Sequence, residues 1–248
     1  MRRYPSPNVS SFSFGPGPIP TAVRALMVAN VAVFLIQFFF PNVTDVLGLR
    51  PIFVVRYFWI WQLATYMFLH GGVFHIVFNM LALWMFGTEL ERTKWGTRYF
   101  LKFYAVTGIG AGLLTVLFSL LPFGFAQQLL RANVIGASGA IYGVLLAYAV
   151  YFPDRPIYMY FVFPIPAKVF VAIIGAIAFL SSLGDSGGVA SATHLGGLLV
   201  AYLFLKSARI HPLSEVKYRY LKWKINRVRR KFDVYSGGRA DDYDRRVH

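Results

Sequence analysis

Cysteine is absent from this chain of 248 residues. Disulfide bonds, zinc–thiolate sites and cysteine nucleophiles are therefore excluded, and the sequence carries no mark of its redox environment. Charged residues are also scarce, at 14% of the chain, where a soluble globular domain has roughly 25%. Together with a hydrophobic content of 57%, this composition predicts a membrane protein.

A cleavable signal peptide is not evident at the N-terminus. Arg2 and Arg3 are basic, but the segment that follows, "YPSPNVSSFSFGPGPIP", is rich in proline, serine and glycine where a signal peptide would be apolar. We interpret residues 1–20 as a flexible cytoplasmic arm. Without a targeting segment, the expected location is a prokaryotic inner (cell) membrane.

Long hydrophobic runs make up most of the remaining chain. A spanning helix needs about 20 largely apolar residues, and six candidates are present, at about 21–40, 73–87, 98–121, 138–152, 167–183 and 189–205. The second and fourth are short, so we expect each to be extended by the small residues before it, with that helix end facing protein or a wet cavity. The predicted fold is an all-α polytopic membrane protein, a six-transmembrane-helix bundle over residues 21–206.

Lysine and arginine predict the direction of these helices. They gather in the N-terminal arm, in the connections after the second and fourth segments, and in the C-terminal tail, so both termini should be cytoplasmic. The second, fourth and sixth helices then run from outside to inside. The long connection 41–72 is aromatic and broken by charge, and we expect it to lie at the boundary of the outer leaflet.

Polar side chains inside the apolar segments are few, and they cluster. His75 and Asn79 are four residues apart and share a helix face, with His70 just before them. Ser138 opens the fourth segment, and His194 lies near the start of the sixth. All are near the outer ends of helices that run in one direction, so they are predicted to meet at one depth.

Such a group could carry nucleophilic catalysis. A serine hydroxyl becomes a nucleophile when histidine takes its proton, and the oxyanion that forms needs hydrogen-bond donors. His75, Asn79 and the backbone N–H of Ser138 could supply them, while Gly136 and Gly139 would allow a substrate backbone to approach closely. Asp185 is in a loop, so a Ser–His dyad is the simpler hypothesis.

Simpler roles remain open for each residue alone. Serine and glycine in membrane helices often serve close helix packing. His194 could be a hydrogen-bonded core residue or part of a proton relay, and His75 and Asn79 could bond across helices. The conjunction of these residues at one depth favours catalysis.

These residues resemble the motifs of the rhomboid family of intramembrane serine proteases. The stretch "GASGAIYG" at 136–143 resembles the family's G-x-S-G box, "HGGVFHIVFN" at 70–79 is similar to its H-x4-H-x3-N pattern, and "THLGG" at 193–197 resembles its last-helix histidine motif. The resemblance implies Ser138 as nucleophile, His194 as base and His75 and Asn79 in the oxyanion region. It also implies that Tyr142 stacks on His194 and that Glu91, in "GTELE", is structural.

The family resemblance implies cleavage of transmembrane protein substrates in or beside their membrane segments, without a metal or cofactor. One departure is Trp61-Gln62 where many members have Trp-Arg, so an arginine tether of the first connection is not expected. Two rival hypotheses are an inactive relative that binds transmembrane helices and a small transporter or channel. The presence of Ser138 and His194 disfavours the first, and their shared depth disfavours the second.

The C-terminal tail, 207–248, holds much of the positive charge and matches nothing in the protease core. Its segment "KYRYLKWKINRVRRKF" at 217–232 could be a basic helix on the anionic cytoplasmic lipid surface or a solvated stretch with no partner. We do not expect it to bind nucleic acid. Residues 236–248 are predicted to be disordered.

Overall fold

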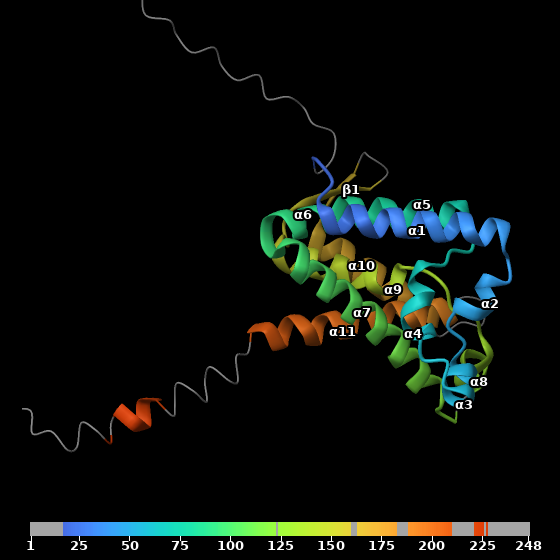
Figure 1. Cartoon of the computed structure of the whole chain (residues 1–248). Coiled ribbons are helices and arrows are strands. Elements are labelled where there is room, and N and C mark those ends of the chain that lie inside the picture. Colours follow the sequence, from blue (N-terminus) through green and yellow to red (C-terminus); the bar gives the residue numbers. More distant parts are fainter. Residues whose placement is uncertain are drawn as a thin grey trace, which may run out of the picture. The chain divides into compact units, whose positions relative to one another are not determined.

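The computed structural model describes residues 17–122, 124–159, 163–182, 188–209, 221–225 and 227. The chain divides into two compact units, Met1–Lys206 and Ser207–His248. Of the predicted basic helix at 217–232, residues 221–225 and 227 are helical and exposed, and the other residues of the segment lie outside the described ones. The first unit, shown in Figure 1, is mostly helical.

Each of the six predicted apolar segments is helical in the first unit. The helices are α1 (Thr21–Phe39), α5 (Val73–Ala82), α7 (Gly96–Ser119), α9 (Ser138–Tyr151), α10 (Ala167–Ser182) and α11 (Gly188–Arg209). Three stretches are long and apolar enough to cross a membrane, Thr21–Phe39, Val73–Ser119 and Gly188–Ser207, while α9 and α10 are shorter apolar helices. The molecule is therefore an integral membrane protein with a helical fold.

The second segment extends beyond its predicted end. After α5 the helix continues through a π-helical turn η2 (Leu83–Gly87), α6 (Thr88–Leu90) and a second π-helical turn η3 (Glu91–Trp95). Gly96 then adopts a φ of 70° and the chain reverses into α7 (Figure 1). That left-handed conformation suits glycine because it has no Cβ.

The predicted N-terminal extension of the two short helices is wrong. Helix α5 begins at Val73, directly after Gly72, and helix α9 begins at Ser138. The residues before Ser138 are non-helical, and Val134 pairs with Leu49 in an isolated antiparallel bridge. A φ of 126° at Gly136 is incompatible with a right-handed helix, which explains why α9 cannot begin earlier.

Helix α9 lies inside the unit, which explains how a short helix can serve a membrane protein. Its 14 residues give a length of about 21 Å, less than the roughly 30 Å of a hydrocarbon core. It packs against α5, α7, α10, η1 (Tyr66–Phe68) and η2. Nine of its residues are buried: Gly139, Ala140, Ile141, Gly143, Val144, Leu145, Ala147, Tyr148 and Ala149. Its N-terminal residues are therefore surrounded mainly by protein.

Glu91 anchors the start of α1. Its two carboxylate oxygens accept hydrogen bonds from the backbone N–H groups of Ala22 and Val23, each at 2.9 Å, and Thr97 Oγ1 donates to it at 2.7 Å. The first N–H groups of a helix lack partners within the helix. They lie at the positive end of the helix dipole, which favours an anion. The buried carboxylate of Glu91 thus caps a helix that lies far from it in the sequence.

The first connection folds into short helical pieces, which are α2 (Val43–Leu47), α3 (Pro51–Tyr57), α4 (Gln62–Thr65) and η1. Gln62 is fully buried and ties two of its turns together. Its Oε1 accepts from the backbone N–H of Arg50 at 3.0 Å, and its Nε2 donates to the carbonyl of Val46 at 3.2 Å. The side chain of Gln62 therefore holds these turns of the first connection together, and no arginine is needed at this position.

Two further elements complete the unit. Helix α8 (Gly124–Arg131) lies in the connection between α7 and α9. Strands β1 (Pro156–Met159) and β2 (Phe163–Pro166) form an antiparallel hairpin between α9 and α10, with Ile157 opposite Ile165. Only helices were predicted from the sequence, so this hairpin is an addition to the predicted fold. Four of its eight strand residues, Ile157, Tyr158, Phe163 and Ile165, are aromatic or β-branched, which are types that favour strands.

Candidate functional site

Ser138 is the first residue of α9, and the chain that enters the helix is fixed at several points. Val134 and Leu49 exchange two backbone hydrogen bonds, of 2.9 and 2.8 Å, and the N–H of Gly136 donates to the carbonyl of Tyr66 at 2.9 Å. The Tyr66 hydroxyl in turn donates to the carbonyl of Gly108 in α7 at 2.7 Å. These hydrogen bonds hold the turn that leads into α9, and they therefore fix the position of Ser138 at the helix end.

The structure brings Ser138 and His194 together. The Oγ atom of Ser138 and the Nε2 atom of His194 lie 2.8 Å apart, although the two residues are 56 positions apart in the chain. When Nε2 carries no proton, the serine hydroxyl donates to it. This is the arrangement in which a histidine can remove the serine proton.

Glycine makes this approach of α9 and α11 possible. A Cβ atom placed on Gly197 would lie 2.0 Å from the carbonyl oxygen of Gly139. Gly197 is three residues after His194, and Gly139 directly follows Ser138, so this close backbone approach lies beside the Ser138 and His194 side chains. Small residues at helix contacts in membranes allow this kind of close packing.

Tyr142 fixes the plane of the His194 ring. The two rings are stacked, with centroids 4.2 Å apart and planes inclined by 8°. Tyr142 is four residues after Ser138 in α9 and therefore projects from the same face of the helix. One helix thus carries both the hydroxyl and the ring that orients its partner.

His75 faces the same place from α5. The backbone N–H of Gly71 donates to His75 Nδ1 at 3.2 Å, so in the neutral ring the hydrogen is on Nε2. A Cβ atom placed on Gly136 would lie 2.8 Å from His75 Nε2 and 3.6 Å from Ser138 Oγ. The space that Gly136 leaves empty therefore adjoins both an N–H donor and the hydroxyl.

Asn79 and His70 lie around His75. Asn79 is one helical turn further along α5, is buried, and its Nδ2 has no hydrogen-bond partner within the described part of the chain. His70 precedes α5 and packs edge-on against His75, with ring centroids 5.0 Å apart. Burial, together with the His75 ring, lowers the pKa of His70 to about 4, so this residue is uncharged at neutral pH.

The start of α9 adds backbone donors to the side chains. The first N–H groups of a helix have no acceptor inside the helix, and they carry the positive end of its dipole. At α9 these groups begin with Ser138 itself. A negatively charged oxygen formed next to Ser138 Oγ would therefore meet backbone N–H groups and the His75 Nε2–H.

Several residues that shape this site were given no role from the sequence. Gly197 and Gly71 both stand inside the quoted motifs, "THLGG" and "HGG", but neither was given a role. Thr193 also stands in "THLGG" and was given no role, although its hydroxyl lies 2.9 Å from that of Thr115 between α7 and α11. Tyr66 and Thr115 lie outside the quoted motifs. The doubled glycines could have been noticed, because such pairs allow close backbone approach.

Comparison with known proteins agrees with the motif pattern. The sequence profile of the family described as "Rhomboid domain" matches residues 57–208. The chain is 36% identical over 140 residues to "Rhomboid protein 1, mitochondrial" of Saccharomyces cerevisiae, which covers 55% of this chain and 38% of the relative. It is 35% identical over 143 residues to "Rhomboid protease GluP" of Bacillus subtilis, covering 56% and 24%.

A third relative is "Rhomboid protease AarA" of Providencia stuartii, 30% identical over 156 residues, with 58% of this chain and 54% of the relative covered. The chain thus spans about half or less of the length of these three relatives. The yeast relative and "RHOMBOID-like protein 12, mitochondrial" of Arabidopsis thaliana are both named as mitochondrial, so the comparisons do not support the prokaryotic inner membrane predicted from the sequence.

Proposed function

Because this chain belongs to the rhomboid family, we propose that it is an intramembrane serine endopeptidase that hydrolyses peptide bonds in or beside the transmembrane segments of membrane proteins. The observation that carries the proposal is the 2.8 Å approach of Ser138 Oγ to His194 Nε2 between α9 and α11. Relatives named as rhomboid proteases in two bacteria support it.

In the proposed reaction, His194 Nε2 takes the Ser138 hydroxyl proton while Oγ bonds to the carbonyl carbon of the substrate. The carbonyl oxygen becomes an oxyanion, which accepts hydrogen bonds from the backbone N–H of Ser138, from His75 Nε2–H and from Asn79 Nδ2. Asn79 Nδ2 has no acceptor among the residues that the structure describes, and this supports the role, since a buried donor without an acceptor is costly unless function uses it.

The oxyanion intermediate then collapses. The peptide C–N bond breaks, His194 gives its proton to the leaving nitrogen, and the acyl group stays on Ser138. In the second half, His194 removes a proton from water as the water oxygen bonds to the ester carbon. The bond between that carbon and Ser138 Oγ then breaks, His194 returns the proton to Oγ, and the carboxylic acid end is released. Tyr142 and His70 support this chemistry by holding the rings of His194 and His75, and the small residues Gly136 and Gly139 leave room for the substrate backbone.

We also assign the membrane arrangement within this proposal. The six apolar helices would all cross the bilayer, with the protease unit at 21–206 and the arm and tail on the cytoplasmic side. Helices α5, α9 and α11 would then enter from the outer side, and Ser138 would lie below the outer surface. Water would reach it from that side.

Purified protein in detergent with a reporter transmembrane substrate tests the proposal. Ser138→Ala and His194→Ala should each lower the cleavage rate by at least 10³-fold, since residues that act as a unit fail together. Ser182→Ala is the matched control, because it removes a hydroxyl that bonds within α10 at Phe179 and should leave cleavage unchanged.

Covalent labelling separates the other outcomes. A serine-directed fluorophosphonate should label the wild type and not Ser138→Ala. Cleavage that persists in Ser138→Ala would refute the dyad. A wild type that neither cleaves nor labels would instead support a relative that binds transmembrane helices without cutting them.

A further inference from the structure

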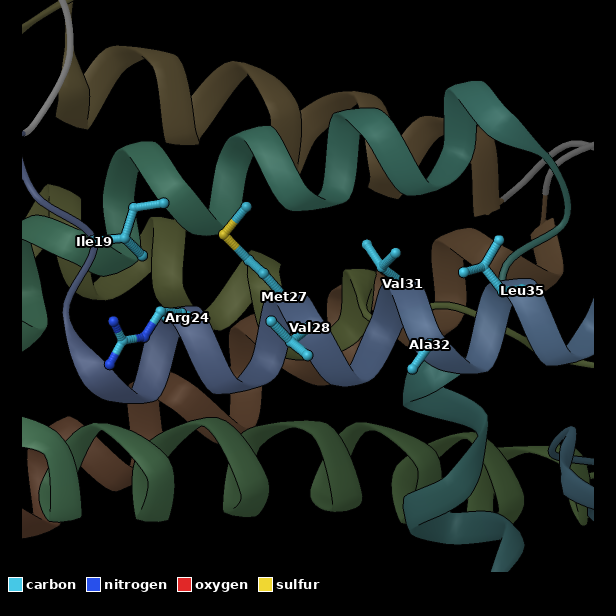
Figure 2. A pocket seen from close by; sticks show the side chains of 7 residues that line it. All are labelled: Ile19, Arg24, Met27, Val28, Val31, Ala32 and Leu35. Atoms are coloured by element: carbon cyan, nitrogen blue, oxygen red, sulfur yellow. The ribbon is translucent and has the colours of Figure 1, made fainter.

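A groove runs along one face of α1, and none of its lining residues belongs to the Ser138 site. It has a volume of about 430 Å³ and is lined by residue 19 and one face of the helix (Figure 2). The lining residues are Ile19, Arg24, Met27, Val28, Val31, Ala32 and Leu35. Ala32 has the shortest side chain in this row.

The groove has one charged end and an otherwise apolar wall. Arg24 is its only charged residue, and six apolar side chains complete the lining. No carboxylate pairs with Arg24 within 4.0 Å in the part of the chain that the structure describes. The acid that caps α1, Glu91, is already occupied by two backbone N–H groups and by Thr97.

The length of the groove matches one leaflet of a bilayer. Arg24 and Leu35 are eleven residues apart in α1, which gives about 16 Å along the helix axis. Half of a hydrocarbon core of about 30 Å is about 15 Å. A molecule with its charge at Arg24 would therefore extend its chain to Leu35 at the middle of the bilayer.

We infer that this groove binds one anionic phospholipid, with the headgroup phosphate at Arg24 and an acyl chain along Met27, Val31 and Leu35. The guanidinium forms paired hydrogen bonds with phosphate oxygens, and the apolar wall fits a hydrocarbon chain. The exposed fractions of Val28, Val31 and Leu35 are 63, 45 and 54%, so these side chains are available to such a chain. This site is independent of the proposed protease reaction.

A cation at one end favours lipid over a protein helix as the occupant. A transmembrane helix from another protein or from a second copy would leave Arg24 without a counter-charge unless it carried an acidic residue at that depth, which is costly in a membrane. An anionic phospholipid would place its headgroup phosphate at the depth of Arg24.

Native mass spectrometry of the delipidated protein tests the site. Phosphatidylglycerol and phosphatidylcholine with identical acyl chains are the probes. We expect the wild type to bind one phosphatidylglycerol more tightly than phosphatidylcholine. Arg24→Gln should weaken the binding of phosphatidylglycerol by about fivefold, the effect of one cation at a lipid surface, and remove the preference. Ala32→Leu should fill the groove and weaken both lipids.

Lys206→Gln is the matched control. It removes one cation from α11, outside the groove, and should leave the preference unchanged. Equal binding of the two lipids by the wild type, or an Arg24→Gln variant that binds as the wild type does, would overturn the proposal.

A crosslink identifies the occupant in the membrane. Because the chain has no cysteine, Val28→Cys supplies a single attachment point for a photoreactive benzophenone. An adduct with the mass of an anionic phospholipid supports the site. A doubled chain, or an adduct to another polypeptide as the main product, refutes it.

Discussion

Replacing Gly197 by alanine should separate the two helices that carry the reacting residues. The added Cβ would lie 2.0 Å from the carbonyl oxygen of Gly139, and Cβ atoms in proteins essentially never lie within 3.0 Å of another non-bonded heavy atom. The backbones must therefore move apart by at least the difference, 3.0 minus 2.0, or about 1 Å. The obstacle is backbone, so no side chain can rotate away.

A displacement of this size acts on the Ser138–His194 pair directly. Their present separation is 2.8 Å, and a shift of 1 Å would carry it beyond hydrogen-bond distance. A misplacement of about 1 Å can lower the rate of an enzyme about 10²-fold. Overpacking of the helix contact should also destabilise the fold by about 1–3 kcal/mol.

The neighbouring Gly196 provides the control. A Cβ there would lie 3.3 Å from the Ala111 carbonyl oxygen, which needs only a small adjustment. Both variants add the same methyl group to α11 and gain the same helix propensity. Cleavage of a reporter substrate, fluorophosphonate labelling and thermal unfolding in detergent should be measured for both. If Gly197→Ala keeps an activity within twofold of Gly196→Ala, the reasoning is refuted.

Three further predictions concern single side chains. Glu91→Ala leaves the N–H groups of Ala22 and Val23 without their acceptor, and we expect a loss of about 1–3 kcal/mol in the free energy of unfolding, measured by thermal or chemical unfolding in detergent; an unchanged stability would contradict the capping role. Tyr142→Phe should retain the stacked ring and near-normal cleavage, whereas Tyr142→Ala should lose about 3–10-fold, the contribution of one aromatic pair; equal rates in the two variants would argue against a role for stacking. Gly136→Ala combines a strained φ with a contact of 2.8 Å to a ring nitrogen, so cleavage and fluorophosphonate labelling should both fall strongly, and normal labelling would show that the entry turn tolerates a side chain.

The apolar runs were sufficient to predict the six apolar helices, because a long apolar run can satisfy its backbone in a membrane only as a helix. The short helices α2, α3, α4 and α8 were not predicted, since no long apolar run marks them. The start of α9 was predicted less well. The sequence suggested that the small residues before Ser138 extend the helix, whereas Gly136 has a φ of 126° and Val134 pairs with Leu49. A pairing of residues that are 85 positions apart leaves no local pattern.

The candidate site was likewise predicted only in part from the sequence. Matching depth and motif spacing were enough to select Ser138, His194, His75 and Asn79 as a group, and their chemical roles stay a prediction. Periodicity indicates which residues lie on one face or at one depth, but it does not indicate which nitrogen of a histidine carries the hydrogen. That followed only from the Gly71 N–H beside His75 Nδ1.

The sequence by itself determined the class of this protein, the positions of its apolar helices and the small set of polar residues among them, because these depend on local composition and on period. The tertiary structure alone decided the distance between Ser138 and His194. That distance depends on the contact of Gly139 with Gly197, on the braced turn at Gly136 and on the ring of Tyr142, which come from segments far apart in the chain. Hydrogen bonding and packing act over a few ångströms in space, and only the folded chain brings these segments within that range.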